Sequence, residues 1–196
     1  MANTDSAAGF QVCNHLGSAY NPAEMRVAFA AGDATAAFKG SLVKLTGAVD
    51  TDGVTPVVTL ASPSDTKLVG AITRFDPQRS GNWTTFYRTA NTRQYAYVPR
   101  DPQTLYMVQE DSVGGNIAVS TAIGQNINFT AESGSTVTGV STMQLDSSTP
   151  AADTAALPIR LIGPVYRADN DPTSSSSNGA WIVKINQNDL DNTTGT

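Results

Sequence analysis

Apolar and polar residues alternate with a period of two through most of the chain after about residue 25. Such runs are typical of half-buried strands, and here they are separated by Gly, Pro, Ser, Asn and Asp, which favour turns. We expect strands over residues 25–30, 41–46, 54–60, 67–73, 95–98, 104–109, 116–121, 126–130, 142–145, 157–165 and 180–185. No run with a helical period exceeds about two turns. The pattern predicts an all-β protein, either a single β-sandwich or a barrel-like body.

The final two expected strands indicate which side chains face a core. Alternate residues of a strand point to the same side of the sheet. The large apolar residues that share a face are Leu157, Ile159 and Leu161 in one strand and Trp181, Val183 and Ile185 in the other. We therefore expect each of these strands to bury one face.

Residues 1–24 lack this alternation and predict an extended N-terminal arm. The arm contains several large apolar or aromatic side chains but is too irregular to form a core of its own. We expect it to lie on its own domain or on a neighbouring subunit, with a frayed terminus as the alternative. Residues 25–196 predict one β-rich body, in which the Gly-, Ser- and Thr-rich stretch 133–156 is a possible loop or sub-domain boundary.

The chain is poor in the residues that usually perform catalysis, with one His, one Cys and three Glu among 196 residues. Cys13 and His15 form a C-x-H pair, but no second pair exists to complete a zinc site. Residues 50–53 and 169–171 contain closely spaced aspartates without the remaining ligands of a calcium loop, so Asx turns explain them better. Nucleophile and phosphate-binding motifs are missing. We predict no enzymatic activity, no metal and no cofactor.

Charge and targeting signals narrow the possible environments. Charged residues make up only 15% of the chain and the net charge is −5, so solubility depends on uncharged polar residues or on surface buried in an assembly. The acidic balance argues against nucleic acid as a partner. The lone Cys13 cannot form an internal disulfide, and no signal-peptide pattern or membrane-spanning run of about 18 residues is visible. We expect a protein made in the cytoplasm, without membrane association.

Positive charge is concentrated in residues 74–100, which contain five arginines against one aspartate. The same segment contains six aromatic residues, and Arg and aromatic side chains are enriched at the hot spots of protein interfaces. The interface residues predicted from this segment are Arg74, Arg79, Trp83, Arg88 and Arg93. The alternatives are intramolecular salt bridges, or stacking on single-stranded nucleic acid.

Three phrases in this order, 34–45 (ATAAFKGSLVKL), 57–62 (VVTLAS) and 67–72 (KLVGAI), resemble head-decoration (cement) proteins of tailed bacteriophages. The arm from residue 9 to 21 and the tail over 161–170 and 181–186 are similar to phage virion proteins. Ser41 stands where the decoration-protein pattern has an acidic residue, and the chain continues beyond the length of the short decoration proteins.

The resemblance implies a structural protein on the outer surface of a virion. Decoration proteins bind the expanded capsid at many symmetry-related sites and stabilise it, so the expected partner is the major capsid protein. A closed homo-oligomer, with a trimer favoured, would bury apolar surface that so weakly charged a chain otherwise exposes. For anchoring by the arm, the predicted residues are Phe10, His15, Leu16 and Tyr20.

Three alternatives remain from the sequence. A tail or head–tail connector component would be built from similar β structure. A carbohydrate- or receptor-binding module would use Trp83, Tyr95, Tyr97 and Trp181 to stack on sugar rings. An Asp-based glycosidase is the remaining enzymatic alternative, because fourteen aspartates leave room for a pair that meets only in space.

Overall fold

The computed structural model describes residues 3–17, 23–77, 86–131, 133–149, 156–171 and 178–191. Within these residues the chain is nearly all β, which confirms the predicted fold class. The elements are β1 (Gln11–His15), β2 (Glu24–Phe29), β3 (Leu42–Val49), β4 (Pro56–Leu60), β5 (Gly70–Ala71), β6 (Arg74–Phe75), β7 (Gln94–Pro99), β8 (Thr104–Gln109), α1 (Val119–Ala122), β9 (Asn126–Ile127), β10 (Ile159–Pro164) and β11 (Ala180–Ile185).

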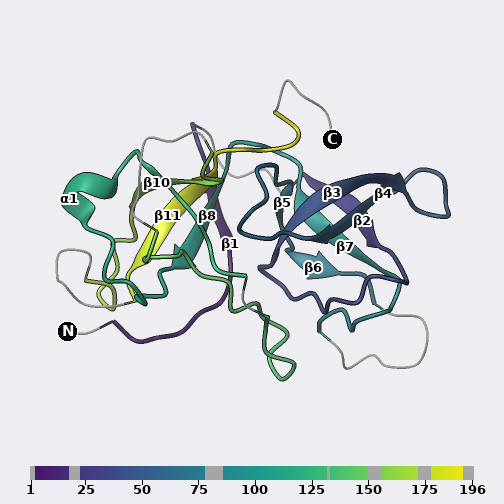
Figure 1. Ribbon diagram of the computed structural model, residues 1–196, viewed down its shortest axis with the longest axis horizontal. Helices are drawn as coiled ribbons and strands as arrows, with labels where there is room; N and C mark the ends of the chain where they lie inside the picture. The colour runs from purple at the N-terminus through teal and green to yellow at the C-terminus, as the bar shows by residue number, and fades with distance from the viewer. Residues whose placement is uncertain are drawn as a thin grey trace.

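Two sheets lie side by side along the long axis of the molecule (Figure 1). One has five antiparallel strands in the order β1-β8-β11-β10-β9. The other has six strands in the order β5-β3-β4-β2-β7-β6, and β2 and β4 form its one parallel pair. The end strand β5 contacts β7, although three strands separate them in the sheet, because the six-stranded sheet curls like a half-barrel.

Each sheet has its own hydrophobic core. The core of the six-stranded sheet lies inside its curl and includes Val27, Phe29, Val43, Val58, Ile72 and Val98. The core of the five-stranded sheet also takes in Leu42 of β3 and Ala71 of β5. These two residues connect the second core to the six-stranded sheet, so the two sheets are built into one body rather than joined by a free linker.

The alternation predicted for the last two strands is confirmed in β10 and β11, except that Leu157 lies before β10 and is only half-buried. Ile159 and Leu161 are buried on one strand, and Trp181, Val183 and Ile185 are buried on the other. β11 has the predicted bounds, and β10 covers the middle of the predicted run. The two strands pair with each other, and together they supply much of the core of the five-stranded sheet.

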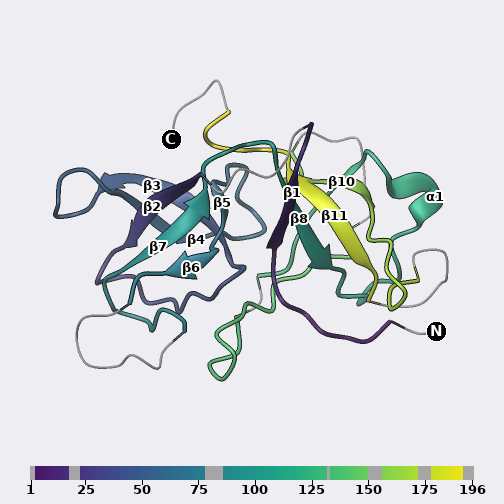
Figure 2. The same ribbon diagram turned by 180° about the vertical axis from the view of Figure 1, so that it is seen from behind.

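The N-terminal segment packs on its own chain. β1 pairs with β8 and lies at the boundary between the two sheets (Figure 2). Phe10, just before β1, is 1% exposed and makes edge-to-face contacts with Tyr106 and Phe129, at ring-centroid distances of 6.4 and 6.2 Å. A buried aromatic cluster of this kind fixes the segment to the body.

Two of the expected strands are wrong. Residues 116–121 were expected to be extended, but the short helix α1 begins at Val119, where the amide of Ala122 donates to the carbonyl of Ala118. Residues 142–145 form no strand, only isolated bridges at residues 141 and 145. Met143 and Leu145 are nevertheless fully buried, so the described part of 133–156 is an integral piece of the body.

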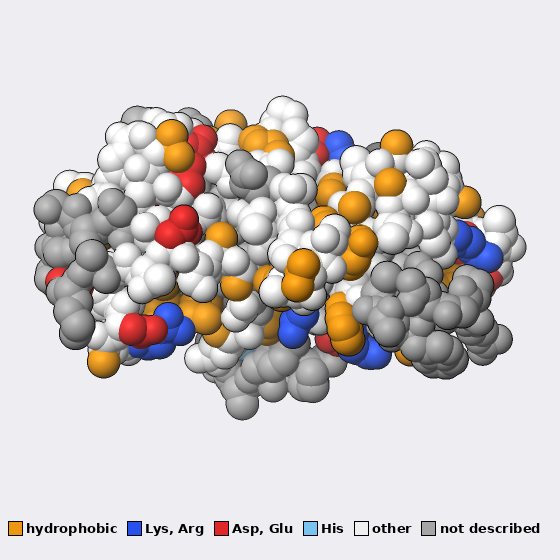
Figure 3. Space-filling view, turned by 90° about the horizontal axis from the view of Figure 1, so that it is seen from below, with side chains coloured by type: hydrophobic (Ala, Val, Ile, Leu, Met, Phe, Trp, Pro, Cys, Tyr) orange, Lys and Arg blue, Asp and Glu red, His pale blue; other side chains and the backbone are white. Residues whose placement is uncertain are grey.

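The surface is sparsely charged, as Figure 3 shows for the face seen from below. Apolar side chains gather near the middle and right of this face, between uncharged polar groups. Within the described residues, no helix combines the length and the hydrophobicity that crossing a membrane requires.

Candidate functional site

The outer face of the six-stranded sheet carries the most organised group of exposed side chains. In β2 and β7, Val27 and Ala96 point into the core while their neighbours point outward, since successive side chains alternate across a strand. Arg26, Tyr95 and Tyr97 therefore share the outer face.

The arginines of this face stack on its tyrosines. The guanidinium carbon of Arg26 lies 3.6 Å from the ring centroid of Tyr95, and that of Arg74 lies 3.6 Å from the ring centroid of Tyr97. Arg93 approaches the Tyr95 ring at 5.2 Å. These distances are typical of cation–π contacts.

A carboxylate accompanies each of the three arginines. Glu24 Oε2 accepts a hydrogen bond from Arg74 Nε at 2.9 Å, and Asp76 lies 3.4 Å from Arg26 Nε. Asp50 binds the guanidinium of Arg93 and accepts a 2.8 Å hydrogen bond from the hydroxyl of Tyr95. We call this group the Arg–Tyr surface; it consists of Glu24, Arg26, Asp50, Arg74, Asp76, Arg93, Tyr95 and Tyr97.

These contacts keep the charges of the Arg–Tyr surface in place. The hydrogen bond to Glu24 raises the pKa of Arg74, and the hydrogen bond from Arg93 lowers the pKa of Asp50. The side chains of Arg26, Arg74 and Arg93 still keep 44%, 57% and 40% of their surface exposed. These guanidinium groups therefore lie at the surface, where an ion pair contributes only about 0–1 kcal/mol to folding.

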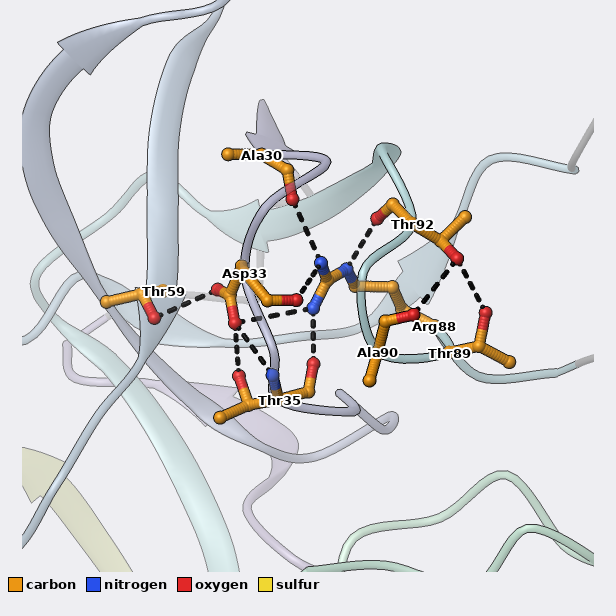
Figure 4. A network of polar contacts seen from close by, with 8 residues as sticks. All are labelled: Ala30, Asp33, Thr35, Thr59, Arg88, Thr89, Ala90 and Thr92. Atoms are coloured by element: carbon orange, nitrogen blue, oxygen red, sulfur yellow. Dashed lines mark hydrogen bonds and ion pairs between the residues drawn. The ribbon is translucent and has the colours of Figure 1, made fainter.

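Arg88, a predicted interface residue, is instead completely buried, and that prediction is corrected here (Figure 4). Its Nη2 donates to the carbonyls of Ala30 at 3.0 Å and Asp33 at 2.8 Å, and its Nε donates to the carbonyl of Thr92 at 2.8 Å. Nη1 donates to the carbonyl of Thr35. Burial lowers the pKa of Arg88, while the nearby Asp33 carboxylate acts in the opposite direction. A side chain with no exposed surface and four carbonyl partners acts within the fold and has nothing to present to a partner.

The carboxylate of Asp33 completes the buried cluster around Arg88. Its Oδ1 accepts hydrogen bonds from the amide and the hydroxyl of Thr35, at 2.9 and 2.6 Å, and its Oδ2 accepts one from the Thr59 hydroxyl at 3.0 Å. Burial works against ionisation of Asp33, but the hydrogen bonds outweigh it and lower the pKa. The cluster thus joins the loop after β2 to β4 and to the turn before β7.

The residues predicted for the arm have different positions. Phe10 is buried and offers no surface to a partner, whereas Leu16 is 47% exposed. His15 Nε2 lies 2.6 Å from Asp101 Oδ2, which ties the end of β1 to the turn before β8. Tyr20 lies outside the described residues, as do Arg79 and Trp83 of the second predicted set.

The structure therefore brings Arg74 and Arg93 of the predicted interface set together on one face and adds residues that were not predicted for it. Arg26 is 48 positions from Arg74 in sequence, and the pairing of both β2 and β6 with β7 makes them neighbours. Its position in an alternating strand indicated that Arg26 would be exposed. No local pattern indicated which strand would lie beside it.

The aromatic residues proposed for sugar binding are poorly placed for it. Trp181 is 2% exposed, and its indole lies in the core. A guanidinium lies over each of the rings of Tyr95 and Tyr97. Trp83 lies outside the described residues. Within the described residues, no group of three or more His, Cys, Asp or Glu side chains is arranged to hold a metal ion.

Comparisons with protein-family models, with curated proteins and with solved structures returned no match.

Proposed function

We propose that this chain is a structural protein of a tailed-phage virion, which binds the outside of the capsid and stabilises it without catalysis. The observation that carries the proposal is the Arg–Tyr surface, an exposed array of interface-type side chains fixed on a rigid sheet. Arg and Tyr are among the residues that contribute most to protein–protein binding. The ion pairs hold the long side chains in place, so less side-chain freedom is lost on binding.

The segments that resemble decoration proteins are consistent with this proposal. Residues 42–45, 57–60 and 70–71 of those segments fall in β3, β4 and β5, with Ser41 directly before β3. These three strands are neighbours in the six-stranded sheet, so the resemblance follows a contiguous part of the fold. The same sheet carries the Arg–Tyr surface on its β2-β7-β6 side.

In this role the protein acts as a homo-oligomer, with a trimer favoured, on the major capsid protein. Each single contact with the capsid can be weak, because the copies of an oligomer are linked and bind neighbouring capsid subunits with a high effective concentration. No bond is made or broken in the process.

Copy number tests the proposal directly. Particles of the source phage are purified on a density gradient, and this protein is quantified against the major capsid protein. The proposal expects a ratio near one to one or a simple fraction such as one third. A handful of copies per particle would assign the protein to the tail or connector, and absence from particles would exclude a virion role.

A pair of variants tests the Arg–Tyr surface itself. We expect the double variant Arg74→Ala/Tyr97→Ala to fold normally and to weaken binding to undecorated heads by tenfold or more, about 1.4 kcal/mol or greater. Arg160→Ala, an exposed arginine on β10 of the other sheet, is the matched control and should bind like the unmodified chain. Equal occupancy of both variants on heads would remove the Arg–Tyr surface from the contact.

A further inference from the structure

Only one asparagine of the sequence is followed by glycine, in the dipeptide Asn178-Gly179 directly before β11. Asparagine is a thermolabile residue, because the backbone nitrogen of the next residue can attack the carbon of its side-chain amide. Glycine obstructs this attack least, since it has no Cβ. The sequence therefore contains one preferred position for deamidation.

Four hydrogen bonds hold this dipeptide against the end of β8 and the residues just after it. The amide of Asn178 donates to Ser112 Oγ at 2.5 Å, and its carbonyl accepts from Gln109 Nε2 at 3.0 Å. The amide of Gly179 donates to Glu110 Oε1 at 3.1 Å, and its carbonyl accepts from the Glu110 amide at 2.9 Å. The next residue begins β11, which pairs with β8 (Figure 1). The dipeptide is thus fixed to the five-stranded sheet.

The contact between Gly179 and Glu110 opposes deamidation in the folded chain. The nitrogen of Gly179 must lose its proton before it can attack, and this N–H group donates to the Glu110 carboxylate. A negative charge on the nitrogen would lie 3.1 Å from Glu110 Oε1, where like charges repel and disfavour ionisation. Glu110 is only 2% exposed, so water and salt screen this repulsion weakly. Asn178 itself has a φ of 64°, in the left-handed region, which the hydrogen bonds of its amide and carbonyl maintain.

We propose that Asn178 is the deamidation site of this protein and that Glu110 sets the rate of the reaction by holding the Gly179 amide. When this hydrogen bond opens, hydroxide takes the proton of the Gly179 nitrogen. The nitrogen then bonds to the side-chain carbonyl carbon of Asn178, and the side-chain nitrogen takes a proton from water and leaves as ammonia. Water opens the resulting five-membered succinimide at either of its carbonyls. One opening gives an aspartate, and the other gives an isoaspartate, whose main chain is longer by a carbon atom.

The product weakens the contact that restrained the reaction. The additional main-chain carbon of an isoaspartate displaces the Gly179 amide from Glu110. Either product also adds a negative charge to a segment that is bound to two consecutive acids, Glu110 and Asp111. Deamidation therefore loosens the start of β11. This inference concerns the chemical ageing of the chain and does not rest on the proposed virion role.

The first test compares the folded chain with the chain unfolded in urea, both incubated at mildly alkaline pH. Peptide mass spectrometry follows the mass increase that accompanies conversion of the Asn178 amide to an acid. We expect the reaction to be roughly tenfold or more slower in the folded chain, because the Gly179 amide must first leave a charged acceptor. Asn91 is the internal control, since it also has a positive φ, of 55°, but is followed by the β-branched Thr92. In urea, Asn91 should react more slowly than Asn178.

Two outcomes of this comparison would overturn the proposal. One is an equal rate for Asn178 in the folded and the unfolded chain, which would show that the fold does not restrain the reaction. The other is a lack of preference for Asn178 over Asn91 in urea, which would show that the dipeptide is not the preferred site.

The second test assigns the restraint to Glu110. Glu110→Gln removes the charge at nearly constant size and should accelerate deamidation of the folded chain by roughly fivefold or more, with no change in urea. Ser112→Ala removes the acceptor of the Asn178 amide and should act in the same direction, with a smaller effect. Arg88→Lys, which removes donors from the buried cluster of the other sheet, is the control for a general loss of stability. It should leave the rate at Asn178 unchanged, because local opening before β11 does not require the six-stranded sheet to unfold.

The variants separate a specific restraint from general stability. If Glu110→Gln and Ser112→Ala both leave the rate unchanged, Glu110 does not set it. If Arg88→Lys accelerates the reaction as much as Glu110→Gln, deamidation proceeds through global unfolding and the assignment to Glu110 is wrong.

The product identifies the nucleophile. Attack by the Gly179 nitrogen gives a mixture of aspartate and isoaspartate, and methylation by an isoaspartate-specific methyltransferase should label position 178 after incubation. Aspartate alone would show direct hydrolysis of the side chain by water, which would overturn the route through Gly179.

Discussion

Arg88 and Arg74 come from the same positively charged segment of the sequence, yet the structure uses them in opposite ways. Arg88 is fully buried, and its guanidinium donates to four backbone carbonyls. Arg74 is 57% exposed, and its partners are the side chains of Glu24 and Tyr97. Backbone carbonyls cannot leave without unfolding the loops that carry them, whereas exposed side-chain partners can be exchanged for groups of another protein.

The comparison shows how a buried arginine that holds the fold together differs from an exposed arginine of the same segment. Both residues are arginines of the same charged segment, so the sequence does not distinguish them. They differ in the exposure of their side chains and in whether their partners are backbone carbonyls or side chains. If this distinction is correct, substitutions in the buried Arg88 cluster act on folding, and those on the Arg–Tyr surface act on binding.

The largest expected effect is that of Arg88→Lys. An ammonium cannot reproduce the planar set of N–H donors, so carbonyls and the Asp33 carboxylate lose buried partners. We expect the free energy of unfolding in urea to fall by about 3 kcal/mol or more. A loss below about 1 kcal/mol would show that the cluster is not the structural element described here.

A second buried ionic group, Glu110, should have a smaller effect. Its carboxylate accepts hydrogen bonds from the amides of Ile117 at 2.8 Å and Gly179 at 3.1 Å, and from the side chain of Trp181. Burial raises its pKa, so part of what these bonds contribute is offset by the cost of desolvating the charge. We expect Glu110→Ala to lower the free energy of unfolding by about 1–3 kcal/mol, because the donors lose their acceptor.

The exposed Asp169→Ala is the control for Glu110→Ala. Its carboxylate is 72% exposed and pairs with Arg167 at the surface. Its removal should change the free energy of unfolding by less than about 0.5 kcal/mol. If both variants unfold at the same urea concentration, burial of Glu110 does not contribute to stability.

Sequence periodicity predicted the strands well where both faces of the pattern were unambiguous. In β11, Trp181, Val183 and Ile185 share the buried face and alternate with the half-buried Ala180, Ile182 and Lys184, so a period of two gives the correct buried face. At residues 116–121 the period was misleading. The apolar Val119 and Ala122 lie in a one-turn helix, and the amide of Ile117 donates to the carboxylate of Glu110, seven residues earlier, instead of pairing with a strand.

The candidate site was predictable only in part, for a related physical reason. The enrichment in Arg and aromatic residues pointed to the segment that contains Arg74 and Arg93, and both of these side chains are exposed in the structure. The burial of Arg88 depends on carbonyls of residues 30–35, more than fifty positions away, which no local pattern reveals. The same holds for Arg26, which joins the surface through the pairing of β2 with β7.

On the Arg–Tyr surface, the single variant Arg74→Ala should have little effect on folding. The residue loses an ion pair with Glu24 and a stacking contact with Tyr97, both at an exposed position. We expect the free energy of unfolding in urea to change by less than about 1 kcal/mol. A loss as large as that of Arg88→Lys would make this surface a structural element, and the distinction between the two arginines would fail.

The smallest expected effect is a pH dependence at Asp52, in the β3–β4 connection beside the Arg–Tyr surface. Hydrogen bonds from the hydroxyl and amide of Thr55 and from the amide of Val54 lower the pKa of Asp52 to about 2. Because this pKa lies below the usual value of 3.8, the ionised carboxylate stabilises the fold above about pH 4, and this contribution is lost as the pH falls toward 2. The hydrogen bond from Arg93 to the neighbouring Asp50 acts in the same direction. Unfolding in urea at pH values from 2 to 5 should therefore show a steeper loss of stability for the unmodified chain than for Asp52→Asn, and equal slopes would show that Asp52 is no better bound in the folded protein than in the unfolded chain.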